Sequence, residues 1–433
     1  KALVAGPRTL KELIPTLTKL IVNRLGSSLE QKVIAGNALS ELVRKAGDGL
    51  FLSLLPVLQE GLYSNDANIK QGICIALREL IGSASLEALE DHEKILISVV
   101  RTALIDSAEE VRETAAEAFD SLQKLLGKRA VNQVLPHLLN QLATDSDAKS
   151  ALSALLTLVK EKTRSSAILP SLIPTLITSP ISSFNAKALA SLSTVTGSTM
   201  TRKLSIILNA LMENIIICED EDLHAHLSTS FDTVILSVDE FDGLDIVMNF
   251  FLINLKHENH RRRAITGQHT AEFFMNTTVD YSRYNQDIIR ALLVLFDDRD
   301  GEVVKAAWIA LNEFTKRLKK EEMETLVFST RQVLHQVGIP EINLPGFELP
   351  KAINAILPIF LQGLMNGNTD QKSQSALAIS EIVDKTSQES LKPFASQITG
   401  PLIRVVSERS VEVKSAALHT LDRLVRKIPS FIK

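Results

Sequence analysis

The sequence SAEEVRETAAEAFDSLQKLLG at residues 107–127 decides how this chain is expected to fold. It reads as a polar turn followed by a helix. Small residues lie on one side of this helix: Ala115, Ala116 and Ala118. Larger apolar residues recur at helical spacing: Val111, Phe119, Leu122 and Leu126. A second amphipathic helix is predicted over 94–104, and neither helix can bury its apolar face alone, so the two are expected to pair.

The same helix pair returns along the chain with a period of roughly 40 residues, which is typical of helical solenoids. Each second helix opens with a basic residue, then has small residues within one turn and apolar residues three and four positions apart. These basic residues are Lys70, Arg112, Lys305, Lys372 and Lys414. Small side chains let a helix lie close to its partner, and larger apolar ones fill the seam. We therefore predict an all-α fold, an α-solenoid of about ten HEAT/ARM-type helical-hairpin repeats.

Prolines recur in the predicted first helices of these pairs. They stand in the apolar segments LIPTL, LLPVL, VLPHLL, LIPTL, ILPIFL and TGPLI. Proline costs little in a first helical turn, where its missing N–H has no partner in any case. Each of them is expected to open or kink a helix: Pro15, Pro56, Pro136, Pro174, Pro358 and Pro401.

The whole chain is expected to be a single HEAT-repeat solenoid, and a fragment of a longer chain because it begins at Lys1 without an initiator Met. We place the first five repeats at 1–200, the middle repeats at 201–320, an insertion at 321–351 and the last two repeats at 352–433. The insertion should carry an extra helix and a proline-rich loop. The apolar loop residues are expected to pack on the solenoid itself rather than on a partner: Ile342, Leu344 and Phe347.

Composition argues against several classes of protein. The formal net charge of −4 over 433 residues argues against a dedicated nucleic-acid binder, so no sequence-specific nucleic acid is expected as a partner. Cys74 and Cys218 are expected to be buried, reduced thiols, which fits a reducing compartment. No apolar run reaches the length of about 20 residues that crosses a bilayer. We therefore expect a cytoplasmic chain with no membrane partner.

Catalytic motifs are missing from the sequence. It has no GxxxxGK[ST], no GxGxxG after a strand, no GxSxG and no HExxH. His224 and His226 form the sequence HAH, but no nearby cysteine or carboxylate completes a metal site. The faces of a solenoid also lack deep pockets of convergent ionisable groups. The chain is expected to be no enzyme and to need no cofactor or metal.

One turn carries a dense positive cluster in the sequence KHENHRRRAITGQHTAEFF. His260, Arg261, Arg262 and Arg263 stand at a helix start, where the helix dipole disfavours cations, and this makes them candidate partner-binding residues. Arg263 also occupies about the same position as Arg112, where HEAT repeats often pair a basic residue with an acidic residue of the neighbouring turn. A binding role and a repeat-stabilising role are both open for Arg263, whereas Arg261 and Arg262 are expected to be exposed.

Several stretches resemble the C-terminal HEAT region of the family of general control nonderepressible protein one: ALSELVRKAG, LLPVLQEGLYS, KQGICIALREL, RTALIDSAEEVRETAAEAFDSL, LPKAINAILPIFLQGL and QITGPLIRVVSERSVEVKSAAL. They occur in collinear order over most of the chain. This family comprises very large ribosome-associated activators of the translation-initiation-factor (eIF2-alpha) kinase. The resemblance implies a non-catalytic scaffold that binds the RWD domain of that kinase and promotes its activation on stalled ribosomes during amino-acid starvation. The ribosome would be contacted through other parts of the full-length protein.

The family's kinase-binding arginine lies in a short basic helix start, and the matching sequence here is RRRAITGQHTAEFF. By this resemblance Arg263 aligns best, with Arg261 and Arg262 as neighbours, and the middle repeats are the candidate RWD-binding part. Two other classes of α-solenoid remain open. An importin-β-like transport receptor would usually be strongly acidic, and a phosphatase scaffold subunit would show more uniform repeats without the long insertion.

Overall fold

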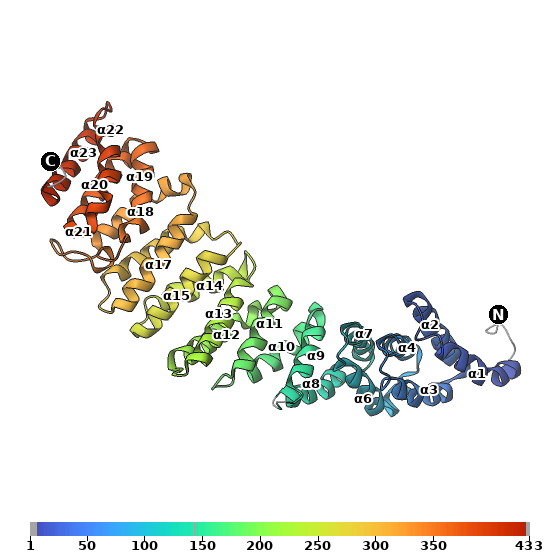
Figure 1. Ribbon diagram of the computed structural model, residues 1–433. Coiled ribbons are helices and arrows are strands. Elements are labelled where there is room, and N and C mark those ends of the chain that lie inside the picture. Colours follow the sequence, from blue (N-terminus) through green and yellow to red (C-terminus); the bar gives the residue numbers. More distant parts are fainter. Residues whose placement is uncertain (1–6, 143, 145, 430–433) are drawn as a thin grey trace. The chain divides into compact units, whose positions relative to one another are not determined.

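The computed structural model describes residues 7–142, 144 and 146–429, and throughout these residues the chain forms helices and turns without a β-strand (Figure 1). The chain divides into two compact units, Lys1–Thr178 and Ser179–Lys433. Each unit is built from helix pairs. Within each unit, the prediction of an all-α chain of HEAT-type helical hairpins is confirmed.

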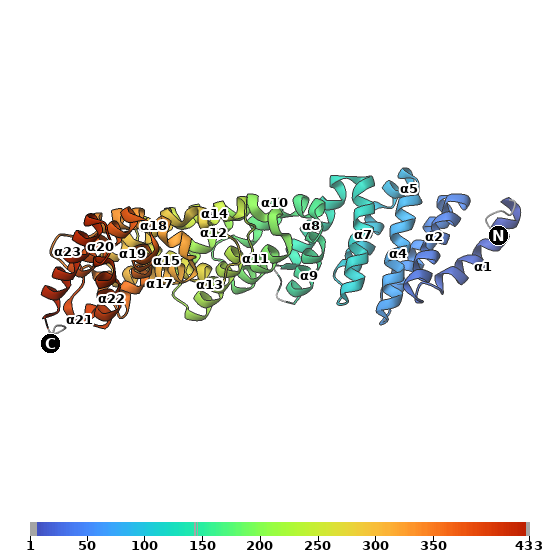
Figure 2. The same cartoon turned by 90° about the horizontal axis from the view of Figure 1, so that it is seen from above.

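The first unit consists of helix pairs whose second members stack on one another. Its helices are α1 (Pro7–Val22), α2 (Leu29–Ala46), α3 (Asp48–Gly61), α4 (Ala67–Ser83), α5 (Leu86–Asp91), α6 (Glu93–Leu104), α7 (Glu109–Leu126), α8 (Lys128–Leu142), α9 (Ala148–Val159) and α10 (Lys162–Leu176). Helix α4 packs between α2 and α7, and Figure 2 shows these three helices side by side. The residues predicted to face the seam from α7 are buried: Val111, Ala115, Ala116, Ala118, Phe119, Leu122 and Leu126.

The second unit repeats this arrangement and adds short 3₁₀ turns. Its helices are α11 (Ser183–Thr196), α12 (Thr201–Ile217), α13 (Glu221–Leu236), α14 (Asp242–Asn254), α15 (His260–Asn276), α16 (Asn285–Val294), α17 (Gly301–Arg317), α18 (Lys320–Gln336), α19 (Leu357–Asn366), α20 (Thr369–Asp384), α21 (Gln388–Leu391), α22 (Ala395–Val406) and α23 (Val411–Lys427). The 3₁₀ turns are η2 (Gly197–Met200), η3 (Ser282–Tyr284), η4 (Leu295–Asp297), η5 (Pro345–Phe347), η6 (Ala352–Ala355) and η7 (Lys392–Phe394). Second helices again stack on each other, α11 on α13, α15 on α17 and α20 on α23.

Close packing of the second helices depends on small residues, as the sequence predicts. A Cβ atom built on Gly267 of α15 would lie 2.9 Å from the Cβ of Ala306 in α17. On Gly72 of α4 it would lie 1.9 Å from the carbonyl oxygen of Leu25. Neither position has room for a side chain, so these glycines set how closely neighbouring repeats approach.

The prolines of the pattern occupy two kinds of position in their helices. Pro358 lies in the first turn of α19 and opens that helix. The other prolines of the pattern lie inside their helices: Pro15, Pro56, Pro136, Pro174 and Pro401. Among them, α3, α8, α10 and α22 start well upstream of the proline; α8, for example, starts at Lys128 and contains Pro136. The preceding turn, and not the proline, therefore determines where these helices begin.

The insertion has the expected extra helix, α18, followed by a loop at 337–351 that packs largely on its own unit. Leu344 and Phe347 are buried, as predicted, and the Phe347 ring lies 5.8 Å from that of Phe296. The backbone N–H of Leu344 donates a 2.7 Å hydrogen bond to the carbonyl of Lys385. Ile342 differs from the expectation, because its side chain is 56% exposed. The loop is held at its base, while its tip projects into solvent.

The two cysteines are free and have different surroundings. Cys74 is fully buried in α4, and this burial raises the pKa of its thiol to about 12. Cys218 follows the last turn of α12 and is only half-buried, so the expectation of burial is wrong for it. A search of the described helices for one that is long and apolar enough to cross a bilayer finds none.

Candidate partner-binding site

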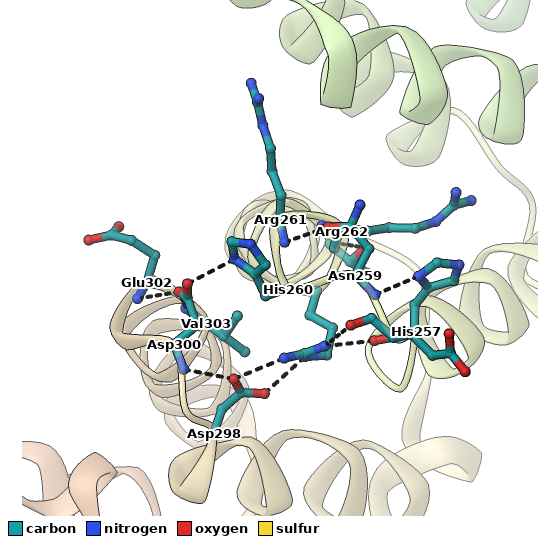
Figure 3. Close-up of polar contacts among 12 residues, drawn as sticks. His257, Asn259, His260, Arg261, Arg262, Asp298, Asp300, Glu302 and Val303 are labelled. Carbon is teal, nitrogen blue, oxygen red and sulfur yellow. Dashed lines mark hydrogen bonds and ion pairs between the residues drawn. The ribbon is translucent and has the colours of Figure 1, made fainter.

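The positive cluster opens α15, and the residue before it caps the helix. The side chain of Asn259 accepts hydrogen bonds from the backbone N–H groups of Arg261 at 2.9 Å and Arg262 at 3.3 Å (Figure 3). Asparagine is a favoured N-cap because its oxygen satisfies donors that have no partner inside the helix. With the backbone fixed in this way, the four side chains from His260 to Arg263 leave the helix in different directions.

Arg263 is an internal residue of the repeat stack. Its Nε donates to Oδ2 of Asp298 at 2.9 Å, and its Nη2 donates to Oδ1 at 3.0 Å. Its Nη1 donates to the backbone carbonyls of His257 and Glu258, both at 2.8 Å. The side chains of Arg263 and Asp298 are only 16% and 9% exposed. A two-bond arginine–carboxylate pair of this kind fixes geometry as well as charge, so Arg263 ties its own turn to the turn before α17.

Other repeats use the same position for the same purpose. Lys70 Nζ lies 2.7 Å from Asp106 Oδ2, and Lys372 Nζ lies 2.5 Å from Glu408 Oε1. Arg112 instead donates to the carbonyls of Asp106 and Ser107, both at 2.9 Å. The other basic residues of the pattern, Lys305 and Lys414, form no ion pair within the described part of the chain. The geometry of Arg263 thus matches the repeat-stabilising interpretation.

Arg262 is buried, although the sequence predicts an exposed side chain. It is 8% exposed, and its Nε donates to Oδ1 of Asn254 at 2.5 Å. Its guanidinium also pairs with Glu213 and lies 3.4 Å from Oδ1 of Asn209, both in α12. The prediction failed because these acceptors lie on other helices, Asn254 on α14 of the same repeat and Glu213 and Asn209 on α12 of the preceding one. Arg262 joins three helices and offers little surface to a partner.

Arg261 and His260 are the exposed members of the cluster. The Arg261 side chain makes one hydrogen bond with the described residues, from Nη2 to the carbonyl of Cys218 at 3.3 Å. Figure 3 shows it pointing away from the Asp298 pair. His260 is 65% exposed, and its Nδ1 lies 2.8 Å from Oδ2 of Asp300. Of the four candidate residues, these two present their polar groups to solvent.

Two ionisable groups next to His260 and Arg261, Asp300 and His224, have shifted pKa values. Backbone hydrogen bonds from Val303 and Glu302 hold the pKa of Asp300 below its usual value, so a charged carboxylate lies beside His260. Burial lowers the pKa of His224, and the charge of Arg261 lowers it further.

In the residues that the structure describes, no group of three or more His, Cys, Asp or Glu side chains is arranged to hold a metal ion.

Comparison with known proteins shows that the chain is similar to GCN1 proteins. Residues 168–351 match the family described as "Stalled ribosome sensor GCN1-like, HEAT repeats". The chain is 42% identical over 438 residues to the eIF-2-alpha kinase activator GCN1 of Saccharomyces cerevisiae, covering 100% of this chain and 16% of that protein. It is 34% identical over 440 residues to the human stalled ribosome sensor GCN1, covering 99% of this chain and 16% of that protein.

The chain is homologous to one HEAT-repeat segment of the GCN1 proteins. It spans 16% of the length of these relatives. The names of the GCN1 relatives describe a kinase activator and a ribosome sensor rather than enzymes, in agreement with the prediction of a non-catalytic chain. Among solved structures, the karyopherin Kap121p bound to Pho4p aligns with 98% of this chain and 42% of that chain, at 13% identity and a TM-score of 0.41.

Proposed function

We propose that this chain is a non-catalytic docking scaffold that binds the RWD domain of the eIF2-alpha kinase. The observation that carries the proposal is the match to the yeast kinase activator GCN1 along the entire chain. A segment with no catalytic motif contributes to kinase activation through binding. In this proposal it acts in the cytoplasm during amino-acid starvation, and the rest of the full-length protein contacts the stalled ribosome.

The middle repeats, 201–320, are the RWD-binding part in this proposal. Arg261 and His260 make direct contact, because their polar groups are exposed at one edge of the second unit. Arg263 and Arg262 hold that edge in shape through Asp298 and Asn254. In this proposal all four residues predicted from the sequence belong to the site. His260 and Arg261 contact the partner, and Arg262 and Arg263 position them.

Binding of the isolated RWD domain to this chain, measured by isothermal titration calorimetry, tests the proposal. We expect saturable binding with one RWD domain per chain, weakened by Arg261→Ala. Arg409→Ala is the matched control, because Arg409 is also exposed in a turn but belongs to another repeat, the turn before α23. Failure of the RWD domain to bind, under conditions in which the corresponding segment of yeast GCN1 binds it, would overturn the proposal.

A further inference from the structure

A groove of about 490 Å³ runs beside Arg263, between the turn at 255–259 and α16. Aliphatic side chains make its floor, and the residues concerned are Leu255, Ala291, Val294 and Leu295. Leu255, Ala291 and Leu295 are buried beneath the surface, whereas Val294 is 50% exposed. Val294 therefore gives the groove apolar surface that none of the described residues of the second unit covers, and burying such surface against a partner is favourable.

Arg263 fixes one wall of this groove. Its Nη1 holds the carbonyls of His257 and Glu258, and both of these residues line the groove. The other end of the same guanidinium is held by Asp298. The wall is therefore tied to the next repeat, and the groove exists before any partner arrives. A preformed groove avoids the entropy cost of ordering a loop on binding.

The rim of the groove is positively charged. Lys256 and Arg290 line it and are exposed, and neither forms a side-chain hydrogen bond or an ion pair with the residues described here. Glu258 is the acidic residue that lines the groove. Complementary charge across an interface selects a partner and speeds its association, so carboxylates are the groups that this rim favours.

We propose that the groove receives an apolar side chain of the RWD domain, flanked by carboxylates that pair with Lys256 and Arg290. The identity of the partner rests on the proposed function, whereas the chemistry of the occupant rests on the floor and rim of the groove. Arg263 acts here as a positioning residue, because its guanidinium faces Asp298 and two carbonyls. The same edge then has two contact areas, the groove and Arg261.

Two matched pairs of variants test this proposal through RWD-domain affinity. Val294→Glu places a carboxylate on the groove floor, and Ile253→Glu makes the same change at a 68% exposed position outside the groove. Arg290→Glu reverses a rim charge, and Arg409→Glu reverses an exposed charge in the turn before α23. We expect Val294→Glu and Arg290→Glu each to weaken binding about tenfold or more and the controls to change it less than about twofold. Melting curves should stay the same for all four, since the altered side chains are exposed.

A second experiment is independent of the RWD domain. Random dodecapeptides displayed on phage are selected on this chain, with the Val294→Glu protein used to remove peptides that bind elsewhere. Enriched peptides should combine an apolar residue with neighbouring Asp or Glu. Enrichment of basic peptides would overturn the assigned chemistry.

The outcomes separate the two proposals. If the RWD domain binds equally well to Val294→Glu and Arg290→Glu, the groove inference is wrong and the proposed function stands. If acidic apolar peptides bind the groove while the RWD domain does not bind the chain, the proposed function and the assigned partner are both wrong. If the protein is a dimer that Val294→Glu converts to a monomer, the occupant is a second copy and the RWD assignment is overturned.

Discussion

Arg263 in α15 and Asp298 in the turn before α17 form a two-bond ion pair, at 2.9 and 3.0 Å, that joins two successive repeats. Both side chains are mostly buried, and the same guanidinium holds two backbone carbonyls. A substitution of Arg263 that abolished partner binding would therefore not show that Arg263 touches the partner. Stability and affinity have to be measured on the same variants.

The first prediction concerns Arg263 itself. Arg263→Ala leaves the mostly buried Asp298 without its partner, and we expect it to lower the free energy of unfolding by about 2–4 kcal/mol. Arg263→Lys should recover only part of this loss, because an ammonium has three donors and no planar fork, and so cannot replace the bonds to both Asp298 and the two carbonyls. Thermal melting followed by circular dichroism measures both effects. Wild-type melting of Arg263→Ala would contradict the structural role.

The second prediction concerns Arg261, the exposed arginine of the cluster. Arg261→Ala should change the free energy of unfolding by less than about 0.5 kcal/mol, as is usual for surface changes. The same variant should weaken RWD-domain binding about tenfold, which corresponds to ~1.4 kcal/mol. Affinity of the wild-type chain should also fall from low to physiological salt, because exposed charges are screened. Binding that is independent of salt would point to an interface without these charges.

The third prediction concerns the pKa of His224, which NMR titration can follow. Burial and the Arg261 charge hold the pKa of His224 below its usual value. Removing the charge in Arg261→Ala should raise this pKa, but not fully, since burial is the larger cause. Because the folded-state pKa is the lower one, the contribution of His224 to stability is present above the unfolded value and is lost as the pH falls through the folded one. An unchanged pKa in Arg261→Ala would place the arginine away from His224.

The fourth prediction compares two apolar residues of the 337–351 loop. Phe347 is fully buried against Phe296, so Phe347→Ala should cost about 3–5 kcal/mol of stability. Ile342 is 56% exposed, so Ile342→Ala should cost less than about 0.5 kcal/mol. Chemical denaturation of both variants makes the comparison. Equal losses would mean that the tip of the loop packs as tightly as its base.

The sequence predicted those features that repeat or are local. The seam of α7 follows from helical spacing alone, and all seven of the seam residues that this spacing identifies are buried. The position of Arg263 follows from comparison with Arg112, because both arginines stand at the start of a second helix and hold backbone carbonyls of the preceding turn. The burial of Arg262 could not be predicted, since its acceptors Glu213 and Asn254 lie on other helices and follow no repeating pattern. The groove was missed for the same reason, because its floor and walls come from two different repeats.

The contact between Gly267 and Ala306 has a consequence for the edge that carries the charges. Gly267 and His260 belong to α15, and Ala306 follows Asp300 into α17, so the closeness of the two backbones determines how far apart these charged turns stand. Even a methyl group at position 267 would push the helices apart and stretch the 2.8 Å contact between His260 and Asp300. The spacing of these charged turns is thus set inside the protein, by a buried residue that has no side chain.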